Sequence, residues 1–441
     1  MLAPRFSVGK ANSTRELRSP AGTVQGHFLS GVNCIVIRAQ HLPNATYASL
    51  PHGYHRSNMS APLFSPFKLR SVEFSNRIGV SPMCQYSSLD GFASNWHLVH
   101  LGSRAQGGAG LVLLEAAAVT PEGRISPDDL GIWKEDHILG VLPIAEFVHS
   151  QGARAGMQLA HAGRKASTAS PFNGHGLVLP ADGGWQPVAP SAIAFAPTGY
   201  AVPTALDSAG IATVVDAFRD AARRALEAGF DFVEIHAAHG YLLHEFLSPL
   251  SNHRTDIFGG SFDNRIRLTL QVVDAVRSIW PERLPLFVRI SATDWAEGGW
   301  NIDESVALAR ELRDHGVDLV DCSSGGNVVD AKIPLAPGYQ VGFASRIRRE
   351  AGIATAAVGL ITEPAQANAI IAESEADFVF LARAELRDPY GPVHAAEALG
   401  ETVSWPKQYL RAAPQGSTAR TAVTRPWNPD SEFLSTVTRP S

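Results

Sequence analysis

The chain has 441 residues, of which 45% are hydrophobic and 18% charged, with a formal net charge of −5. This composition is typical of a folded globular protein, and it lacks the basic surplus of nucleic-acid-binding proteins. No run approaches the ~18 consecutive apolar residues of a membrane-spanning helix. We therefore expect neither a nucleic acid nor a membrane as a partner.

The first 58 residues differ from the rest because they carry several arginines and lysines but a single acid, Glu16. This composition is typical of organelle-targeting segments, yet Met59 would serve equally well as a start before the patterned region. We expect 1–58 to be a leader or a poorly ordered, non-native extension, and we predict a cytoplasmic protein with organelle targeting as the alternative. Residues 59–411 form the expected domain. Residues 412–441 lack periodicity and predict a mobile tail.

The three cysteines, Cys34, Cys84 and Cys322, are widely separated and odd in number. Their spacing fits neither a disulfide framework nor a CxxC metal site. We expect reduced thiols and no metal bound by them.

From residue 62 onward, short apolar segments alternate with amphipathic helical segments, which predicts βαβ units. The expected strands are 77–81, 111–115, 154–159, 232–236, 286–291, 319–322, 355–358 and 378–381. The expected helices include 137–150, 211–228, 264–279, 303–315, 343–350, 363–372 and 392–399.

Eight such units, without a GxGxxG turn after the first strand, favour a single (β/α)8 TIM barrel over a doubly wound sheet. A short β-hairpin expected within 63–72 would cap the barrel floor. The segment 170–200, rich in Gly, Pro and Ala, predicts a long loop after the third strand. Loops of that length are usually functional.

Active sites of this fold lie at the carboxyl ends of the strands, where this sequence is rich in hydrogen-bond donors and poor in acids. Such a rim suits an anionic ligand. Phosphates are commonly held after strands seven and eight, where Gly359 and Arg383 stand, and Gly325 and Gly326 follow strand six. Single glycines are more often simple turns. Their joint placement favours a cofactor that carries a phosphate.

The segment after the fourth strand contains His236, His239 and Tyr241. The paired histidines could be metal ligands, although no familiar zinc motif completes the set. They could also be histidines with purely structural partners. The third interpretation is that both donate hydrogen bonds to one carbonyl oxygen, while Tyr241 delivers a proton as a general acid.

Three segments carry a resemblance that spans about 62–411: Pro82-Met83-Cys84-Gln85-Tyr86, the run from Gln158 to Lys165, and the run 236–261. In these segments the chain resembles the old yellow enzyme family, in its thermophilic-like branch of NADPH-dependent ene-reductases. The resemblance implies a non-covalent FMN across the barrel mouth, reduced by NADPH. It also implies hydride transfer from flavin N5 to the β carbon of an α,β-unsaturated carbonyl compound.

The flavin contacts that the resemblance implies lie at several strand ends. They are Ser81, Pro82, Met83, Cys84, Ala116, Gln158, Arg289, Ala382 and Arg383, in addition to the candidate glycines 325, 326 and 359. Arg289 would stabilise negative charge on the reduced ring. Cys84 would tune the flavin without acting as a nucleophile, although it could equally be a plain buried thiol.

The implied substrate contacts are Tyr86, His236 and His239, with Tyr241 donating the proton to the α carbon. Lys165 resembles a family active-site lysine whose target is open. Arg411 would reach into a neighbouring subunit, which predicts a homodimer or homotetramer. The chain lacks the cysteine cluster of larger iron-sulfur relatives. A metal-dependent barrel enzyme and a non-catalytic phosphate-binding barrel remain as alternatives.

Overall fold

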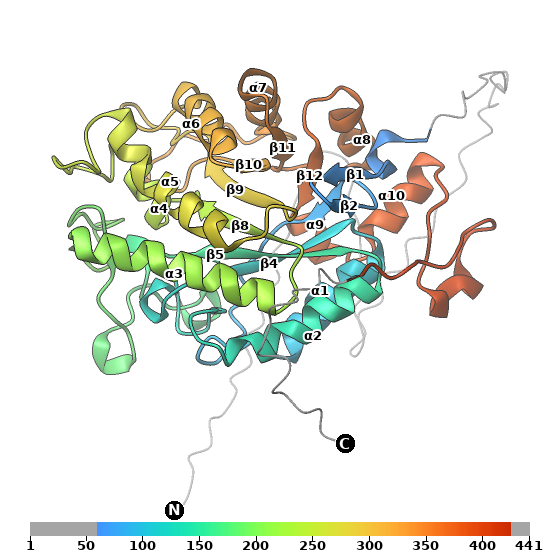
Figure 1. Ribbon diagram of the computed structural model, residues 1–441, viewed down its shortest axis with the longest axis horizontal. Helices are drawn as coiled ribbons and strands as arrows, with labels where there is room; N and C mark the ends of the chain where they lie inside the picture. Colours follow the sequence, from blue (N-terminus) through green and yellow to red (C-terminus); the bar gives the residue numbers. More distant parts are fainter. Residues whose placement is uncertain (1–59, 425–441) are drawn as a thin grey trace, which may run out of the picture. The chain divides into compact units, whose positions relative to one another are not determined.

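The computed structural model describes residues 60–424, in which eight parallel strands close into a barrel (Figure 1). The last strand pairs with the first, with Val379 opposite Ile78. This confirms the expected TIM barrel. In order around the barrel, the strands are β3 (Ile78–Val80), β4 (Leu111–Ala118), β5 (Arg154–Ala160), β8 (Phe232–Ala237), β9 (Leu286–Ser291), β10 (Leu319–Ser323), β11 (Ala354–Ala357) and β12 (Phe378–Leu381).

Helices surround the barrel (Figure 1). The long ones are α1 (Asn95–Gly107), α2 (His137–Ser150), α3 (Ser208–Glu227), α5 (Phe262–Ile279), α6 (Ile302–Asp314), α7 (Val341–Ala351), α8 (Pro364–Ala372) and α10 (Gly391–Leu399). Two short helices, α4 (Leu242–Leu247) and α9 (Arg383–Arg387), follow β8 and β12. The expected helices are confirmed to within a few residues.

The sequence pattern does not predict α1, and the burial of its side chains explains why. Its inward face carries the polar residues His97, His100 and Arg104, whereas Trp96 and Val99 are exposed. The apolar stripe is therefore interrupted, with Leu101 and Ala105 as its buried members. Buried hydrogen bonds supplement it, such as the one from Arg104 to the backbone oxygen of Glu385 at 2.9 Å.

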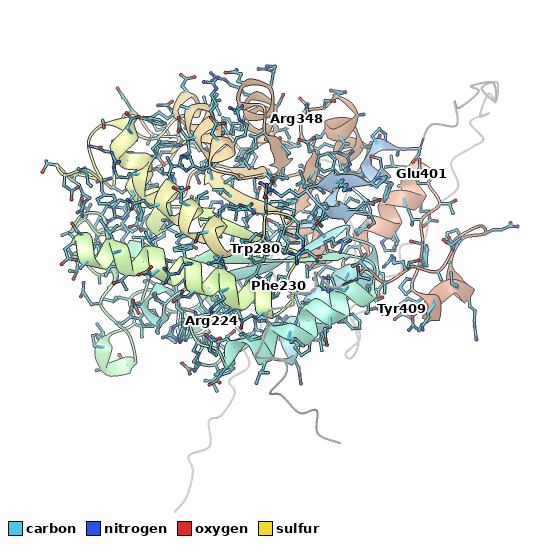
Figure 2. The ribbon with its side chains drawn as sticks, viewed as in Figure 1. Arg224, Phe230, Trp280, Arg348, Glu401 and Tyr409 are labelled. Carbon is cyan, nitrogen blue, oxygen red and sulfur yellow. The ribbon has the colours of Figure 1, made fainter. Side chains whose placement is uncertain are left out.

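The expected hairpin is confirmed as β1 (Phe67–Leu69) and β2 (Val72–Phe74), which pair antiparallel. Phe74 ends the hairpin at the barrel floor. Its ring centroid lies 5.1 Å from that of Phe378 and 5.9 Å from that of Phe232, at the beginnings of β12 and β8. Apolar side chains also fill the layer between strands and helices, where Phe230 and Trp280 are buried (Figure 2).

Inward-facing residues of neighbouring strands form three layers, because side chains alternate along a strand. The floor contains Phe232 and Phe287. The mouth contains His236, Ser291 and Ser323. The middle layer, set by the strand register, contains Gln158, Glu234, Arg289 and Asp321.

The long loop is also present between β5 and α3. Within 170–200 it forms two single 3-10 turns, Pro171–Asn173 and Pro180–Asp182, and the two-residue strand β6 (Val188–Ala189). β6 pairs with β7 (Thr204–Ala205).

Residues 413–424 follow the 3-10 helix η6 (Lys407–Ala412). Arg420 donates hydrogen bonds to the backbone oxygens of Ala105 at 2.8 Å and Gln106 at 2.7 Å, at the end of α1. The backbone of Val423 donates to His149 at 3.0 Å. The expected extension 1–58, Cys34 and the tail segment 425–441 lie outside the described residues. None of the helices between residues 60 and 424 is long and apolar enough to cross a bilayer.

Candidate active site

His236, His239 and Tyr241 lie together at the carboxyl end of β8. The ring centroid of His236 is 5.1 Å from that of His239 and 5.2 Å from that of Tyr241. The backbone turns sharply here, since His239 has φ of 59° and Gly240 has φ of 70°. Within residues 60–424, no three or more His, Cys, Asp or Glu side chains gather in a way that could hold a metal ion.

Two serines hold this turn from the neighbouring strands. Ser291 accepts a hydrogen bond from the backbone N–H of His239 at 2.9 Å and donates one to the backbone oxygen of Gly325 at 2.8 Å. The Nε2 atom of His239 lies 2.7 Å from the hydroxyl of Ser323. The ends of β8, β9 and β10 are therefore linked by serine hydroxyls.

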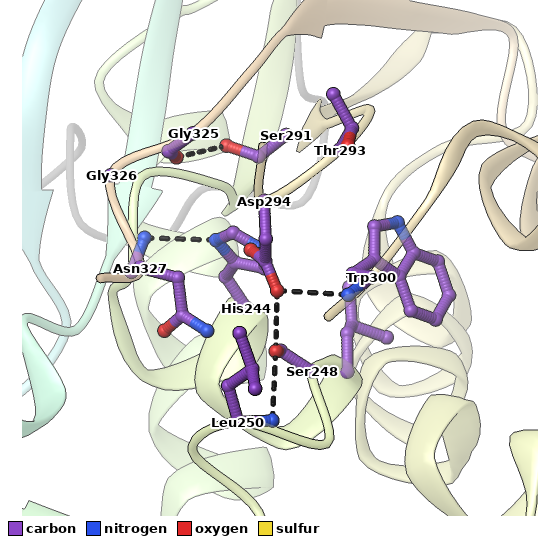
Figure 3. A network of polar contacts seen from close by, with 12 residues as sticks. His244, Ser248, Leu250, Ser291, Thr293, Asp294, Trp300, Gly325, Gly326 and Asn327 are labelled. Atoms are coloured by element: carbon purple, nitrogen blue, oxygen red, sulfur yellow. Dashed lines mark hydrogen bonds and ion pairs between the residues drawn. The ribbon is translucent and has the colours of Figure 1, made fainter. Parts of the chain in front are cut away.

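A second, buried network lies behind the turn (Figure 3). The backbone N–H of Gly240 donates to Nδ1 of His244 at 2.9 Å, and Nε2 of His244 lies 3.0 Å from Asp294. Asp294 also accepts hydrogen bonds from Ser248 at 2.5 Å and from the backbone of Trp300 at 2.9 Å. His244 is thus occupied by structural contacts behind the site.

Lys165 ties the long loop to the site. Its amine donates to the backbone oxygen of His239 at 2.7 Å and also to that of Gly326. It lies 4.1 Å from the ring centroid of Phe195, in the long loop, and 5.5 Å from that of Tyr241. Burial lowers the pKa of Lys165 to about 7, although Glu245 opposes this shift.

Burial also determines the protonation states of His236, His239 and Tyr241. It lowers the pKa of both His236 and His239 well below the usual value, and the nearby charge of Arg289 acts in the same direction. It raises the pKa of Tyr241 well above its usual value. At neutral pH the site therefore holds two neutral imidazoles and a protonated phenol.

The middle layer below the mouth holds four buried polar side chains. Gln158 donates from Nε2 to Oε1 of Glu234 at 2.7 Å. The Nε of Arg289 lies 3.1 Å from Asp321, and its NH1 donates to the hydroxyl of Ser81 at 3.3 Å. Arg289 on β9 thus reaches across the barrel to Ser81 at the end of β3, while Gln158 comes from β5, so three of the predicted flavin contacts converge on the barrel interior.

The segment after β3 carries Pro82, Met83, Cys84 and Tyr86. The backbone N–H of Gln85 donates to Oε1 of Glu115, on β4, at 3.1 Å. Burial raises the pKa of the Cys84 thiol, and the charges of Asp129 and Glu115 add to this, so the thiol stays protonated. Tyr86 adopts φ of 49° and its ring centroid lies 6.0 Å from that of Phe172 in the long loop.

A pocket of about 240 Å³ opens at the ends of β10, β11 and β12. It brings together Gly359, Ala382 and Arg383. Two arginines, Arg383 and Arg387, line it, and none of its lining residues is acidic. A Cβ added at Gly359, where φ is 117°, would lie 2.6 Å from Nε2 of Gln340, so a larger residue would not fit.

The predicted cofactor glycines Gly325 and Gly326 and the predicted intersubunit residue Arg411 lie apart from this pocket. Gly325 and Gly326 do not line it, and a Cβ added at Gly326 would lie 2.7 Å from Cα of His239. Gly326 therefore permits close packing of the β10 and β8 turns. Arg411 is exposed on η6.

The fold agrees with comparisons to known proteins. The model of the NADH:flavin oxidoreductase / NADH oxidase family matches residues 62–401. The chain belongs to this family. It is 49% identical over 356 residues to an NADPH dehydrogenase of Halalkalibacterium halodurans, covering 80% of this chain and 99% of that protein. An NADPH dehydrogenase of a Geobacillus species is 50% identical over 355 residues, with the same two coverages.

Solved structures give the same result for this family member. Morphinone reductase superposes with a TM-score of 0.65 at 29% identity, covering 78% of this chain and 92% of that one. An old yellow enzyme homologue from Zymomonas mobilis superposes with a TM-score of 0.63 at 27% identity, covering 76% and 92%. The protein is thus a flavin oxidoreductase of the old yellow enzyme family, and its relatives imply NADPH as reductant.

Sequence reasoning missed several residues that support the site. Glu234, Asp321, Ser291 and Ser323 were not singled out, although each lies in a predicted strand or directly after one. A polar residue in an otherwise apolar strand is the signal that could have identified them. Such a residue is buried with the strand, and a buried polar group needs a hydrogen-bond partner. Their partners lie on other strands and are invisible in the local sequence.

Proposed function

We propose that the protein is an FMN-dependent ene-reductase that uses NADPH to reduce activated carbon-carbon double bonds. The observation that carries this proposal is the grouping of two neutral imidazoles and a protonated phenol, in which the ring centroid of His236 lies 5.1 Å from that of His239 and 5.2 Å from that of Tyr241. Such a group can bind an oxygen atom and donate a proton nearby.

The residues present fit FMN at both ends. The acid-free pocket with Arg383 and Gly359 suits a phosphate, which favours arginine and close backbone approach. Gln158 and Arg289 provide an amide and a positive charge below the mouth. Ser81, Pro82, Met83, Cys84, Ala116 and Ala382 would complete the cofactor contacts. When bound, FMN supplies the hydride that NADPH provides.

The two histidines would bind the carbonyl oxygen of the substrate. Nε2 of His239 lies 2.7 Å from the hydroxyl of Ser323, and in this proposal the hydroxyl donates to Nε2 and the proton of the neutral imidazole lies on Nδ1. Nδ1 of His236 is buried without a partner, so its proton belongs on Nε2. Each ring can then donate one hydrogen bond to negative charge that develops on the oxygen. The α carbon would receive its proton from Tyr241.

Four further assignments complete the proposal. Tyr86 would contact the substrate, Lys165 would border its site, and Cys84 would tune the flavin. Arg411, exposed in a single chain, would reach the site of a neighbouring subunit in a dimer or tetramer. We further propose that the enzyme acts in the cytoplasm.

The visible absorption spectrum tests the proposal. The protein, purified and supplied with FMN, should be yellow, lose its colour with NADPH without oxygen, and regain it with 2-cyclohexenone. A protein that stays colourless with excess FMN would overturn the proposal.

The variant His236→Ala tests whether this histidine binds the carbonyl oxygen of the substrate. It should keep bound FMN and bleach with NADPH, but turn over the enone slowly. Equal enone turnover in His236→Ala and the unaltered protein would show that the histidine does not bind the carbonyl.

A further inference from the structure

Glu234 is a buried acid that the mechanism above does not use. It faces the barrel interior from β8, two residues before His236, and has no exposed surface. Its Oε1 accepts the hydrogen bond from Nε2 of Gln158, whereas its Oε2 is buried without a hydrogen-bond partner. An ionised carboxylate with an unpartnered buried oxygen is strongly destabilising.

The middle layer contains a second acid, Asp321, and two ionised carboxylates in this buried layer would repel each other. Asp321 is also fully buried, and the one positive group described beside it is Arg289, at 3.1 Å. Neither oxygen of Asp321 receives a well-directed hydrogen bond. One guanidinium therefore faces two carboxyl groups, and a single proton would balance the layer.

The charged groups around Glu234 indicate which acid holds that proton. Burial raises the pKa of Glu234, the charge of Asp321 raises it further, and Arg289 opposes both. Burial raises the pKa of Asp321 as well, but Arg289 lies directly against it. Gln158, the remaining partner of Glu234, is uncharged. The proton is therefore better placed on Glu234.

We propose that Glu234 is a positioning residue, held as a neutral carboxylic acid, that fixes the amide of Gln158 for the cofactor. Its carbonyl oxygen takes one N–H of the Gln158 amide, which leaves the amide oxygen and the second N–H for the barrel mouth. A neutral Glu234 also leaves the charge of Arg289 balanced by Asp321 alone. The identity of the ligand that Gln158 binds rests on the proposed function. The protonation of Glu234 does not depend on it.

Infrared spectroscopy tests the proton without any cofactor. The unaltered apoprotein at pH 7 should show a protonated carboxyl C=O band that is absent from Glu234→Gln. Glu385, another buried acid whose pKa burial raises to about 8, provides the matched control, since Glu385→Gln should lose a band of the same kind. An unchanged spectrum in Glu234→Gln, with a loss in Glu385→Gln, would overturn the neutral assignment.

Binding of FMN to the apoprotein, followed by flavin fluorescence, tests the positioning role. Glu234→Ala removes the acceptor for Gln158 and should weaken FMN binding about 5- to 100-fold, the usual effect of an unpaired buried donor. Glu234→Gln keeps a carbonyl acceptor and should restore most of this loss, and Glu385→Ala should not affect binding. Equal binding by Glu234→Ala and the unaltered protein, or equal losses in Glu234→Ala and Glu234→Gln, would overturn the positioning role.

The two readouts separate this inference from the proposed function. If the unaltered protein binds no FMN, the proposed function fails, while the infrared band still decides the state of Glu234. If FMN binds and the band is missing, the function stands and the inference fails.

Discussion

The amine of Lys165 donates a hydrogen bond of 2.7 Å to the backbone oxygen of His239, the residue whose left-handed backbone brings its ring beside His236. The same amine binds Gly326 and faces the ring of Phe195. One side chain thus joins the turns after β8 and β10 to the long loop.

Lys165→Met should therefore impair enone turnover. Methionine keeps a chain of similar length but removes all donors, so the two buried backbone oxygens lose this partner at a cost of about 1–3 kcal/mol each. We expect kcat/KM for the enone to fall about 10- to 100-fold, with a smaller effect on the NADPH half-reaction. Stopped-flow absorption of each half-reaction measures this. Lys68→Met, at an exposed site on β1, is the control, and an equal effect of both variants would contradict the prediction.

Tyr241→Phe should separate the two half-reactions. Removing the phenol leaves the apolar packing of the ring but abolishes the proton donor, and such donors contribute about 10²- to 10⁴-fold. Reduction by NADPH should persist, while reoxidation by the enone slows by a factor in this range. Tyr409→Phe, exposed on η6, should affect neither rate. Parallel losses in both half-reactions of Tyr241→Phe would assign the proton to another group.

Arg420→Gln should destabilise the protein without changing the chemistry. Arg420 donates to the backbone oxygens of Ala105, Gln106 and Ser404, at the end of the barrel opposite the active site. Loss of these bonds should lower the free energy of unfolding by about 1–3 kcal/mol, measured by urea denaturation. Turnover per bound flavin should be unchanged. Arg349→Gln, at an exposed position on α7, is the control. Unchanged stability of Arg420→Gln would show that residues 413–424 contribute little.

Glu385→Gln should remove one component of the pH dependence of stability. Burial raises the pKa of Glu385 to about 8 in the folded protein, whereas an unfolded glutamate titrates near ~4.3. Between these values the folded state holds a proton that the unfolded state has lost, so stability falls as pH rises through this window.

The side chain of the Glu385→Gln variant has no titratable proton, so the variant does not show this loss of stability. The difference in Tm between Glu385→Gln and the unaltered protein should therefore grow in favour of the variant from pH 5 to pH 8 and then level off. Glu363→Gln, an exposed acid before α8, should show no such trend. A constant difference across the range would mean that Glu385 titrates normally.

The sequence alone was enough to predict eight βα units, the floor hairpin and the grouping of polar residues at one rim. Apolar periodicity and β-branched segments are local properties, so strands such as Leu286–Ser291 and helices such as His137–Ser150 could be read residue by residue. The family resemblance added roles for His236, His239 and Tyr241. Helix α1 was not predicted because buried polar residues interrupt the apolar stripe on its inner face.

Only the tertiary structure decided which polar residues face one another inside the barrel. Gln158 and Glu234 are 76 residues apart, and their hydrogen bond exists because β5 and β8 pair in one particular register. Register in a closed barrel is fixed by all eight strands together, since the stagger must be consistent around the ring. The same reason hid the packing of Gly326 against His239, because this contact joins the turns after β10 and β8.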